Sequence, residues 1–224
     1  MKFIIFDIDG TLANTTVVDE NCFIAAFEDS FGIDISTQNW ADFKHVTDWG
    51  ITEEIIERQW NRKPTPEEYL SLKSNFIQHL KGEKERDVNQ FNEVFGAKDF
   101  FTMLQNMEGV KLGIATGGWG ISAKFKLEHI GIDLKGISFS NSDYYKSREM
   151  ITLNTINQLA RITDEPLEQI IYFGDGEWDF KTCNNLGIEF IGIDVQNNGK
   201  LKKLGAKTVF NDYSKSEEII KAII

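Results

Sequence analysis

Residues 2–11 read Lys-Phe-Ile-Ile-Phe-Asp-Ile-Asp-Gly-Thr, and this stretch decides the fold. A continuous apolar run passes directly into two aspartates, a glycine and a threonine. Short apolar runs bounded by turn residues are typical of buried strands in parallel sheets covered on both faces. Ligands of such sheets bind just beyond the carboxyl ends of the strands. The sequence therefore predicts a buried strand over residues 3–6, followed by a candidate site at Asp7 and Asp9.

Similar apolar runs return along the chain, and helical patterns separate them. Strands are predicted at residues 110–115, 170–173 and 190–193, with weaker signals at 137–139 and 208–210. Apolar residues at helical spacing predict helices at residues 122–130, 149–159, 177–186 and 216–224. Alternation of strand and helix indicates βαβ units. We therefore expect an α/β fold with a doubly wound, Rossmann-like parallel sheet.

The stretch from about residue 17 to about residue 91 breaks this alternation, because it contains helical patterns and no convincing buried strand. Thr65, Pro66 and Glu68 mark a clear helix start, with Thr at the N-cap, Pro at N1 and Glu at N3. An all-helical block between the first and second core strands predicts an inserted cap domain. We place this cap at residues 14–92 and the core at residues 1–13 and 93–224.

Composition restricts the class of protein. The 224 residues carry a formal net charge of −11, which argues against a nucleic-acid partner because phosphate backbones attract clustered Lys and Arg. No apolar run approaches the roughly 20 residues needed to cross a bilayer, and the first residues lack the pattern of a secretory signal. Cys22 and Cys183 suit neither a disulfide framework nor a metal-binding spacing. We expect a cytoplasmic protein without membrane or nucleic-acid partners.

Other predicted strands also end in groups suited to phosphate or to a hard cation. The strand at 110–115 ends at Thr116 and Gly117, where a hydroxyl and freed backbone N–H groups can bind phosphate oxygens. The strand at 170–173 is followed by Asp175 and a second carboxylate four residues later. Any one of these ends alone would also fit a plain turn. Together they favour a phosphate site that contains Mg²⁺.

These motifs resemble, in order, the four motifs of the haloacid dehalogenase superfamily. That superfamily has Asp-x-Asp-x-Thr, a strand ending in Thr or Ser, a Lys or Arg, and Gly-Asp-x-x-x-Asp. The corresponding positions here are residues 7–11, Thr116, Lys146 or Arg148, and residues 174–179. The helical insert resembles the C1 cap of phosphoglycolate-phosphatase-like members. The resemblance covers essentially the whole chain, and its first and fourth motifs are the specific ones.

The resemblance implies a Mg²⁺-dependent phosphatase that hydrolyses a small phosphorylated metabolite through an aspartyl-phosphate. Asp7 would be the nucleophile, and Asp9 would protonate the leaving group and then activate water. The Mg²⁺ ligands would be the side chains of Asp7 and Asp175 and the backbone carbonyl of Asp9. Asp179 would orient a metal-bound water or a neighbouring ligand.

The resemblance also implies how substrate is held. Thr116 and the N–H of Gly117 would bind the non-bridging phosphate oxygens. Thr47 and Asp48 belong to a segment between cap helices where C1 caps place a substrate-specificity loop, although a plain turn fits the same residues. Two alternatives stay open for the whole chain. One is a phosphotransferase or mutase with the same pair of aspartates, and the other is a non-catalytic protein that binds a phosphorylated metabolite.

The third motif leaves two cations to choose from. Many relatives have Lys followed by Pro, whereas Lys146 here is followed by Ser147 and Arg148. Lys146 lies just before the expected N-cap, from where its side chain could extend back over the strand ends. Arg148 lies on the first helical turn and could also reach the site. We expect only one of them to be essential, with a slight preference for Lys146.

Overall fold

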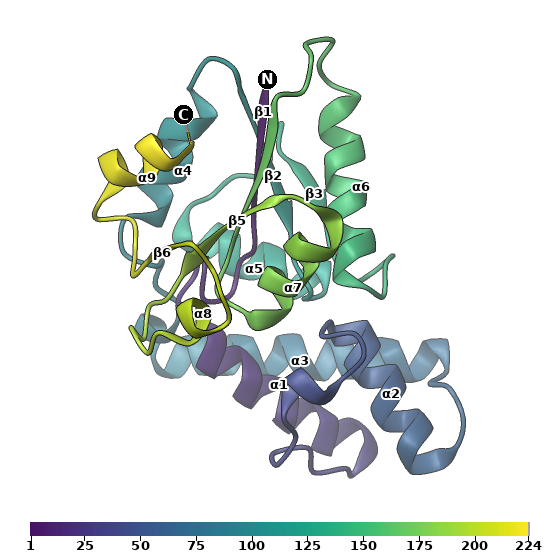
Figure 1. The fold of residues 1–224 in the computed structure, drawn as a ribbon. Coiled ribbons are helices and arrows are strands. Elements are labelled where there is room, and N and C mark those ends of the chain that lie inside the picture. The colour runs from purple at the N-terminus through teal and green to yellow at the C-terminus, as the bar shows by residue number, and fades with distance from the viewer. Residues whose placement is uncertain (224) are drawn as a thin grey trace.

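The computed structural model describes residues 1–223 and contains a six-stranded parallel sheet between layers of helices (Figure 1). The strands are β1 (Lys2–Phe6), β2 (Val110–Ala115), β3 (Ser138–Ser140), β4 (Gln169–Gly174), β5 (Glu189–Ile193) and β6 (Thr208–Phe210). They lie in the order β3-β2-β1-β4-β5-β6, and all neighbouring pairs are parallel. The order reverses next to β1, which is where doubly wound sheets bind ligands. The predicted α/β fold and its strands are confirmed.

The helices are α1 (Thr16–Phe31), α2 (Asp48–Trp60), α3 (Pro66–Arg86), α4 (Ala97–Gln105), α5 (Gly120–Ile130), α6 (Arg148–Ala160), α7 (Glu177–Leu186), α8 (Lys200–Lys203) and α9 (Ser216–Ile223). Two 3₁₀ turns, η1 (Trp40–Asp42) and η2 (Val88–Phe91), connect helices. The helix start at Thr65 is confirmed, because its hydroxyl accepts from Glu68 N while Glu68 Oε2 accepts from Thr65 N. Ile224, the last residue of the predicted C-terminal helix, lies outside the described residues.

The helices α1, α2 and α3 form a layer of their own next to the carboxyl ends of the strands (Figure 1). This layer has its own apolar cluster, which includes Phe23, Phe27 and Phe76. Trp119, which precedes α5 in the sheet layer, is 1% exposed; its ring packs edge-on against Phe76 and at a tilt against Phe23. Trp119 therefore anchors the helical layer over the sheet. The cap boundaries at residues 14 and 92 stay predictions.

Both faces of the sheet are buried under apolar side chains. On one face, Phe6 stacks on Phe173 with ring centroids 4.7 Å apart, and α4 and α9 cover this cluster. On the other face, Phe3, Ile5 and Tyr172 pack under α6 and α7. Burial on both sides explains why the strands have continuous apolar runs rather than alternating ones. The sheet is thus a rigid platform for the loops at its carboxyl edge.

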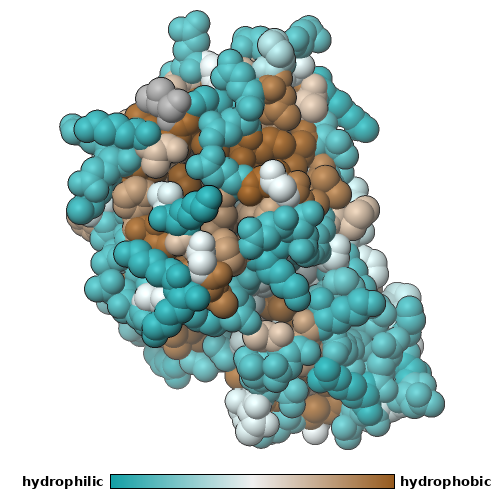
Figure 2. Space-filling view, viewed as in Figure 1, coloured by the Kyte–Doolittle hydropathy of each residue, from teal (hydrophilic) through white to brown (hydrophobic). Residues whose placement is uncertain are grey.

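Figure 2 shows hydrophilic side chains over most of one face of the molecule, including the helical layer, with hydrophobic residues between them over the sheet layer. None of the helices that the structure describes is long and apolar enough to span a membrane.

Candidate active site

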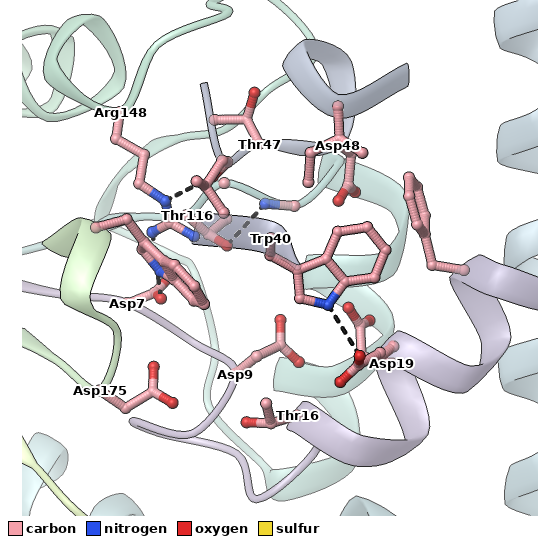
Figure 3. A pocket seen from close by; sticks show the side chains of 17 residues that line it. Asp7, Asp9, Thr16, Asp19, Trp40, Thr47, Asp48, Thr116, Arg148 and Asp175 are labelled. Atoms are coloured by element: carbon pink, nitrogen blue, oxygen red, sulfur yellow. Dashed lines mark hydrogen bonds and ion pairs between the residues drawn. The ribbon is translucent and has the colours of Figure 1, made fainter. Parts of the chain in front are cut away.

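The loops that follow β1, β2 and β4 meet under the helical layer and line a cavity of about 110 Å³ (Figure 3). The cavity brings together most of the site residues predicted from the sequence: Asp7, Asp9, Thr47, Asp48, Thr116, Gly117, Arg148 and Asp175. Two predicted residues, Lys146 and Asp179, are outside its lining. Segments far apart in the sequence therefore converge at the carboxyl edge of the sheet, as the strand-end pattern predicts.

Asp7 follows β1 directly and is 3% exposed. Its Oδ2 lies 3.4 Å from Arg148 Nη1, whereas Oδ1 is buried without a hydrogen-bond partner among the described residues. Burial, followed by repulsion from Asp179, raises the pKa of Asp7 to about 7, and Arg148 opposes this rise. A buried carboxylate oxygen without a partner among the described residues is suited to contact with a bound cation or substrate.

Asp7, Asp175 and Asp179 each place one carboxylate oxygen within 4.8 Å of the other two. Burial and then mutual repulsion raise the pKa of Asp175, and burial raises the pKa of Asp179 despite the adjacent Arg148. Asp179 is already engaged, since its Oδ2 accepts the Gly176 N–H at 3.0 Å. Three crowded carboxylates with hard oxygen donors, one of which has a buried oxygen without a partner in the described part of the chain, fit a divalent cation such as Mg²⁺.

Gly10 allows two of these loops to approach each other. Its φ of +73° is in the left-handed region, which strongly favours glycine. A Cβ at this position would lie 2.0 Å from Asp175 Oδ2. The glycine after Asp7 and Asp9 is therefore what lets the β1 loop contact the acidic β4 loop.

The loop after β2 presents a hydroxyl and backbone N–H groups to the cavity. Thr116 is 2% exposed, and its Oγ1 accepts the Gly118 N–H at 3.1 Å. A Cβ on Gly117 would lie 2.6 Å from Arg148 Nη2, so a larger residue would displace the guanidinium. This loop can hold phosphate oxygens beside a cation.

Arg148 is the cation that reaches the strand ends. Nη1 donates to Asp179 Oδ1 at 2.7 Å, and Nε donates to the Val46 carbonyl at 2.8 Å. Burial opposes its charge, but Asp179 and Asp7 outweigh burial and raise its pKa. Helical side chains tilt toward the helix N-terminus, so a residue on the first turn of α6 extends back toward the sheet edge.

Lys146 differs from its sequence-based expectation. Its Nζ pairs with Glu53 Oε1 on α2 at 2.5 Å instead of extending over the strand ends. The Lys146 carbonyl also accepts from the Thr47 hydroxyl at 2.7 Å. Lys146 precedes the helix, so no helical tilt directs its side chain toward the sheet, and its ammonium pairs with a carboxylate of the helical layer. The preference for Lys146 over Arg148 is therefore not supported by this geometry.

Thr47 and Asp48 begin α2 rather than forming a loop between helices. Thr47 is the N-cap and accepts the Gly50 N–H at 3.0 Å. Asp48 Oδ2 accepts the backbone N–H of Trp119 at 2.8 Å. Burial, followed by repulsion from Asp19, raises the pKa of Asp48 to about 8. Both residues line the cavity on the side of the helical layer.

Asp9 is held by a residue that the sequence reasoning missed. Lys126 Nζ contacts both oxygens of Asp9, at 2.6 and 2.8 Å, and also contacts Asp19 Oδ1. Thr15 Oγ1 donates to Asp9 Oδ1 at 2.5 Å. The available signal was a lysine on the apolar face of the predicted 122–130 helix, three residues after Ala123. Asp19 similarly lies beside the apolar face of α1.

Aromatic and acidic residues of the helical layer complete the cavity. Trp40 Nε1 donates to Glu20 Oε1 at 2.9 Å, and Phe23 lies beside them. Trp178, from the start of α7, lies under the Arg148 guanidinium at 5.5 Å. None of these residues is a defining position of a motif, since Trp178 occupies a variable position of the fourth one, and only the folded chain places them together.

Residues 4–193 match the family model of haloacid dehalogenase-like hydrolases, so the chain belongs to this family. The family resemblance expected from the motifs is thereby confirmed. Among curated proteins, none matches this chain significantly.

Solved structures share the fold at low sequence identity. A hydrolase from Pseudomonas syringae is 19% identical with a TM-score of 0.75, and the match covers 100% of this chain and 99% of that chain. A predicted phosphoglycolate phosphatase from Haemophilus somnus 129PT is 17% identical with a TM-score of 0.64, covering 98% of both chains. A candidate beta-phosphoglucomutase from Bacteroides vulgatus is 14% identical with a TM-score of 0.69, covering 99% of this chain and 89% of that chain.

Proposed function

We propose that this chain is a Mg²⁺-dependent phosphatase that cleaves phosphate monoesters through an aspartyl-phosphate on Asp7. The observation that carries the proposal is the surroundings of Asp7. Asp7 lies at a strand end and lines the same cavity as Arg148, Thr116 and Asp175, and its buried Oδ1 has no hydrogen-bond partner within residues 1–223. Membership of a hydrolase family and the similarity to phosphatase folds support the same chemistry.

In the first proposed step, an Asp7 carboxylate oxygen attacks phosphorus and the bond from phosphorus to the leaving oxygen breaks. Asp9 donates a proton to that oxygen, so the product leaves as a neutral alcohol. In the second step, a water attacks the phosphorus and Asp9 accepts its proton. Inorganic phosphate leaves and Asp7 regains its carboxylate. Two steps of this kind replace one difficult direct hydrolysis.

Negative charge is the main obstacle, because a carboxylate must approach a phosphate dianion. Mg²⁺, held by the Asp7 and Asp175 side chains and the Asp9 carbonyl, would supply positive charge beside the reacting oxygens. Asp179 would orient this set. Arg148 is the cation we propose for the third motif, since it lies between Asp7 and Asp179.

The cavity also supports a proposal about the leaving group. Its volume of about 110 Å³ is small beside the roughly 300–1,000 Å³ of typical ligand pockets, so the leaving group should be small. Glu20 and Asp48 line the side of the helical layer, and Arg148 is the only cation in the lining among the described residues. A leaving group with its own carboxylate would meet two acidic side chains there and, among the described lining residues, no second cation to pair with. We propose a small alcohol that carries hydroxyl or amino groups.

A metabolite screen with Mg²⁺ tests this function by following phosphate release. We expect glycerol phosphate or ethanolamine phosphate to be cleaved faster than phosphoglycolate, because only phosphoglycolate places a carboxylate near Glu20 and Asp48. A faster reaction with phosphoglycolate would contradict the leaving-group proposal but would still support the proposed phosphatase activity. Phosphorylated product without phosphate release would indicate the transferase or mutase. No turnover of any compound would favour the binding protein.

A further inference from the structure

Lys126 is a charged side chain in an apolar place. It lies on α5 and is 1% exposed, and the same face of this helix carries the buried Ala123 and Leu127. A fully buried lysine is rare unless it is paired. Lys126 is paired twice, since its ammonium contacts Asp9 and Asp19. The structure therefore maintains a buried positive charge directly behind one of the cavity carboxylates.

The two carboxylate oxygens of Asp9 accept different numbers of hydrogen bonds. Oδ1 accepts from both Thr15 and Lys126, whereas Oδ2 accepts from Lys126 alone among the described residues. The side chain of Asp9 is 21% exposed and lines the cavity, as Figure 3 shows. Oδ1 is therefore occupied by two donors, and Oδ2 keeps capacity for one proton.

We propose that Lys126 is a positioning residue that fixes the carboxylate of Asp9, so that Oδ2 is the oxygen that exchanges protons with the leaving group and with water. The proposal rests on the proposed function, in which Asp9 is the acid and base. Lys126 is not in the cavity lining and acts only through Asp9, both of whose oxygens its ammonium contacts. Acid–base catalysis requires the donor within hydrogen-bond reach of the reacting oxygen, so a carboxylate that can rotate freely loses rate.

The surroundings of Lys126 argue against a role in stabilising the fold alone. Ion pairs in a buried place commonly stabilise a fold no better than apolar residues of similar volume. Asp19, from the helical layer, supplies a second carboxylate to the same ammonium. The trio of Asp9, Lys126 and Asp19 keeps a formal charge of −1, so the ammonium holds Asp9 without adding net positive charge.

The test compares two aryl esters of similar shape whose leaving groups differ in their need for a proton. Phenyl phosphate releases a basic phenolate, whereas p-nitrophenyl phosphate releases a stabilised one. The measured quantity is kcat/KM, which reports phosphoryl transfer to Asp7. Lys126→Met is the simplest variant. Lys126→Met with Asp19→Asn is the sharper variant, because it keeps the formal charge of the trio at −1.

For the double variant we expect kcat/KM with phenyl phosphate to fall at least about tenfold, a part of the roughly 10²–10⁴-fold that acid–base catalysis contributes. With p-nitrophenyl phosphate it should fall less than about threefold, because that leaving group needs little protonation. Asp19→Asn alone keeps the contact between Lys126 and Asp9, so the ratio of the two kcat/KM values should stay near that of the wild type.

Asp9→Asn separates failure of this inference from failure of the proposed function. If Asp9→Asn shows no dependence on the leaving group, Asp9 is not the acid and the proposed function is wrong at that step. If Asp9→Asn shows the dependence but the double variant lowers both substrates equally, or neither, the assignment of Lys126 is overturned. If circular dichroism shows that both Lys126 variants fail to fold, the role of Lys126 is in folding. That result would also overturn its assignment as a positioning residue.

Discussion

Arg148 and Lys146 are two positions apart, yet their side chains contact different layers. Arg148 pairs with Asp179 and Asp7 at the sheet edge, and Lys146 pairs with Glu53 on α2. Charge and neighbouring sequence are nearly the same for both. Their roles differ because side chains on the first turn of α6 point back toward the helix N-terminus, and of the two only Arg148 lies on that turn. The sequence pattern alone does not show this direction.

Arg148→Ala should lower kcat/KM on the order of 10²-fold or more, comparable with the loss of one preorganised charge partner of the transition state. Lys146→Ala should cost less than about fivefold, because a partly exposed ion pair contributes at most about 1 kcal/mol. Steady-state kinetics with Mg²⁺ measures both. A larger loss of kcat/KM for Lys146→Ala than for Arg148→Ala would show that Lys146 is the cation of the third motif.

At the residue scale, the sequence could predict the groups that immediately follow strands. Asp7, Thr116 and Asp175 are recognisable because each comes directly after an apolar run. Lys126 and Asp19 could not be assigned to the site in the same way, because each comes from a helix interior. Their pairing depends on how α1 packs against α5, which is a contact between segments more than 100 positions apart.

At the element scale, apolar runs predicted all six strands, since burial on both faces leaves a strong and simple pattern. The helices α4 and α8 were not predicted. The helix α8 is only four residues long, and α4 lies where the helical block meets the second core strand. Both depend on packing against neighbours more than on their own periodicity.

The turn after β1 is the element on which the site depends most, and glycine substitutions test it. Gly10 and Gly32 both have positive φ, so alanine at either should destabilise the fold by about 1–2 kcal/mol. An added Cβ at Gly10 would collide with Asp175 Oδ2, whereas one at Gly32 would meet no atom of the other described residues within 4 Å beyond its neighbours in the chain. We therefore expect Gly10→Ala to lose Mg²⁺-dependent activity and Gly32→Ala to retain it.

Thermal melting and kinetics of the two variants measure these effects separately. Equal activities of Gly10→Ala and Gly32→Ala would show that the contact between the β1 and β4 loops is not needed.

At the scale of the whole molecule, a negatively charged chain closes an acidic cavity between two layers. The formal net charge is −11, and Asp7, Asp175 and Asp179 are crowded together at the sheet edge. Such a site is poorly suited to an anionic substrate unless a cation is present. Metal binding should therefore be linked to the stability of the whole fold.

This linkage has a predicted dependence on pH. Asp7 has an ordinary pKa of 3.8 and a pKa of about 7 in the metal-free fold. Between these values the folded chain holds a proton that the unfolded chain has lost, so metal-free stability falls as pH rises toward 7. Mg²⁺ must displace that proton at lower pH. Its stabilisation should therefore be larger at about pH 7.5 than at about pH 5.5.

Melting temperatures with Mg²⁺ and with a chelator, at both pH values, measure the effect. In Asp7→Asn the difference between the two pH values should shrink, because one titrating carboxyl is removed. An equal Mg²⁺ shift at both pH values would contradict a metal site built on Asp7.

The most direct test of the central claim is to trap the phosphorylated enzyme. The enzyme is mixed with a cleavable phosphate monoester and Mg²⁺, quenched in acid within one turnover, and digested for mass spectrometry. We predict that the peptide containing Asp7 gains the mass of one phosphoryl group on that residue, and that this gain is absent with chelator and in Asp7→Asn. A phosphoryl group on any other residue, or turnover by Asp7→Asn within about tenfold of the wild type, would contradict Asp7 as the nucleophile.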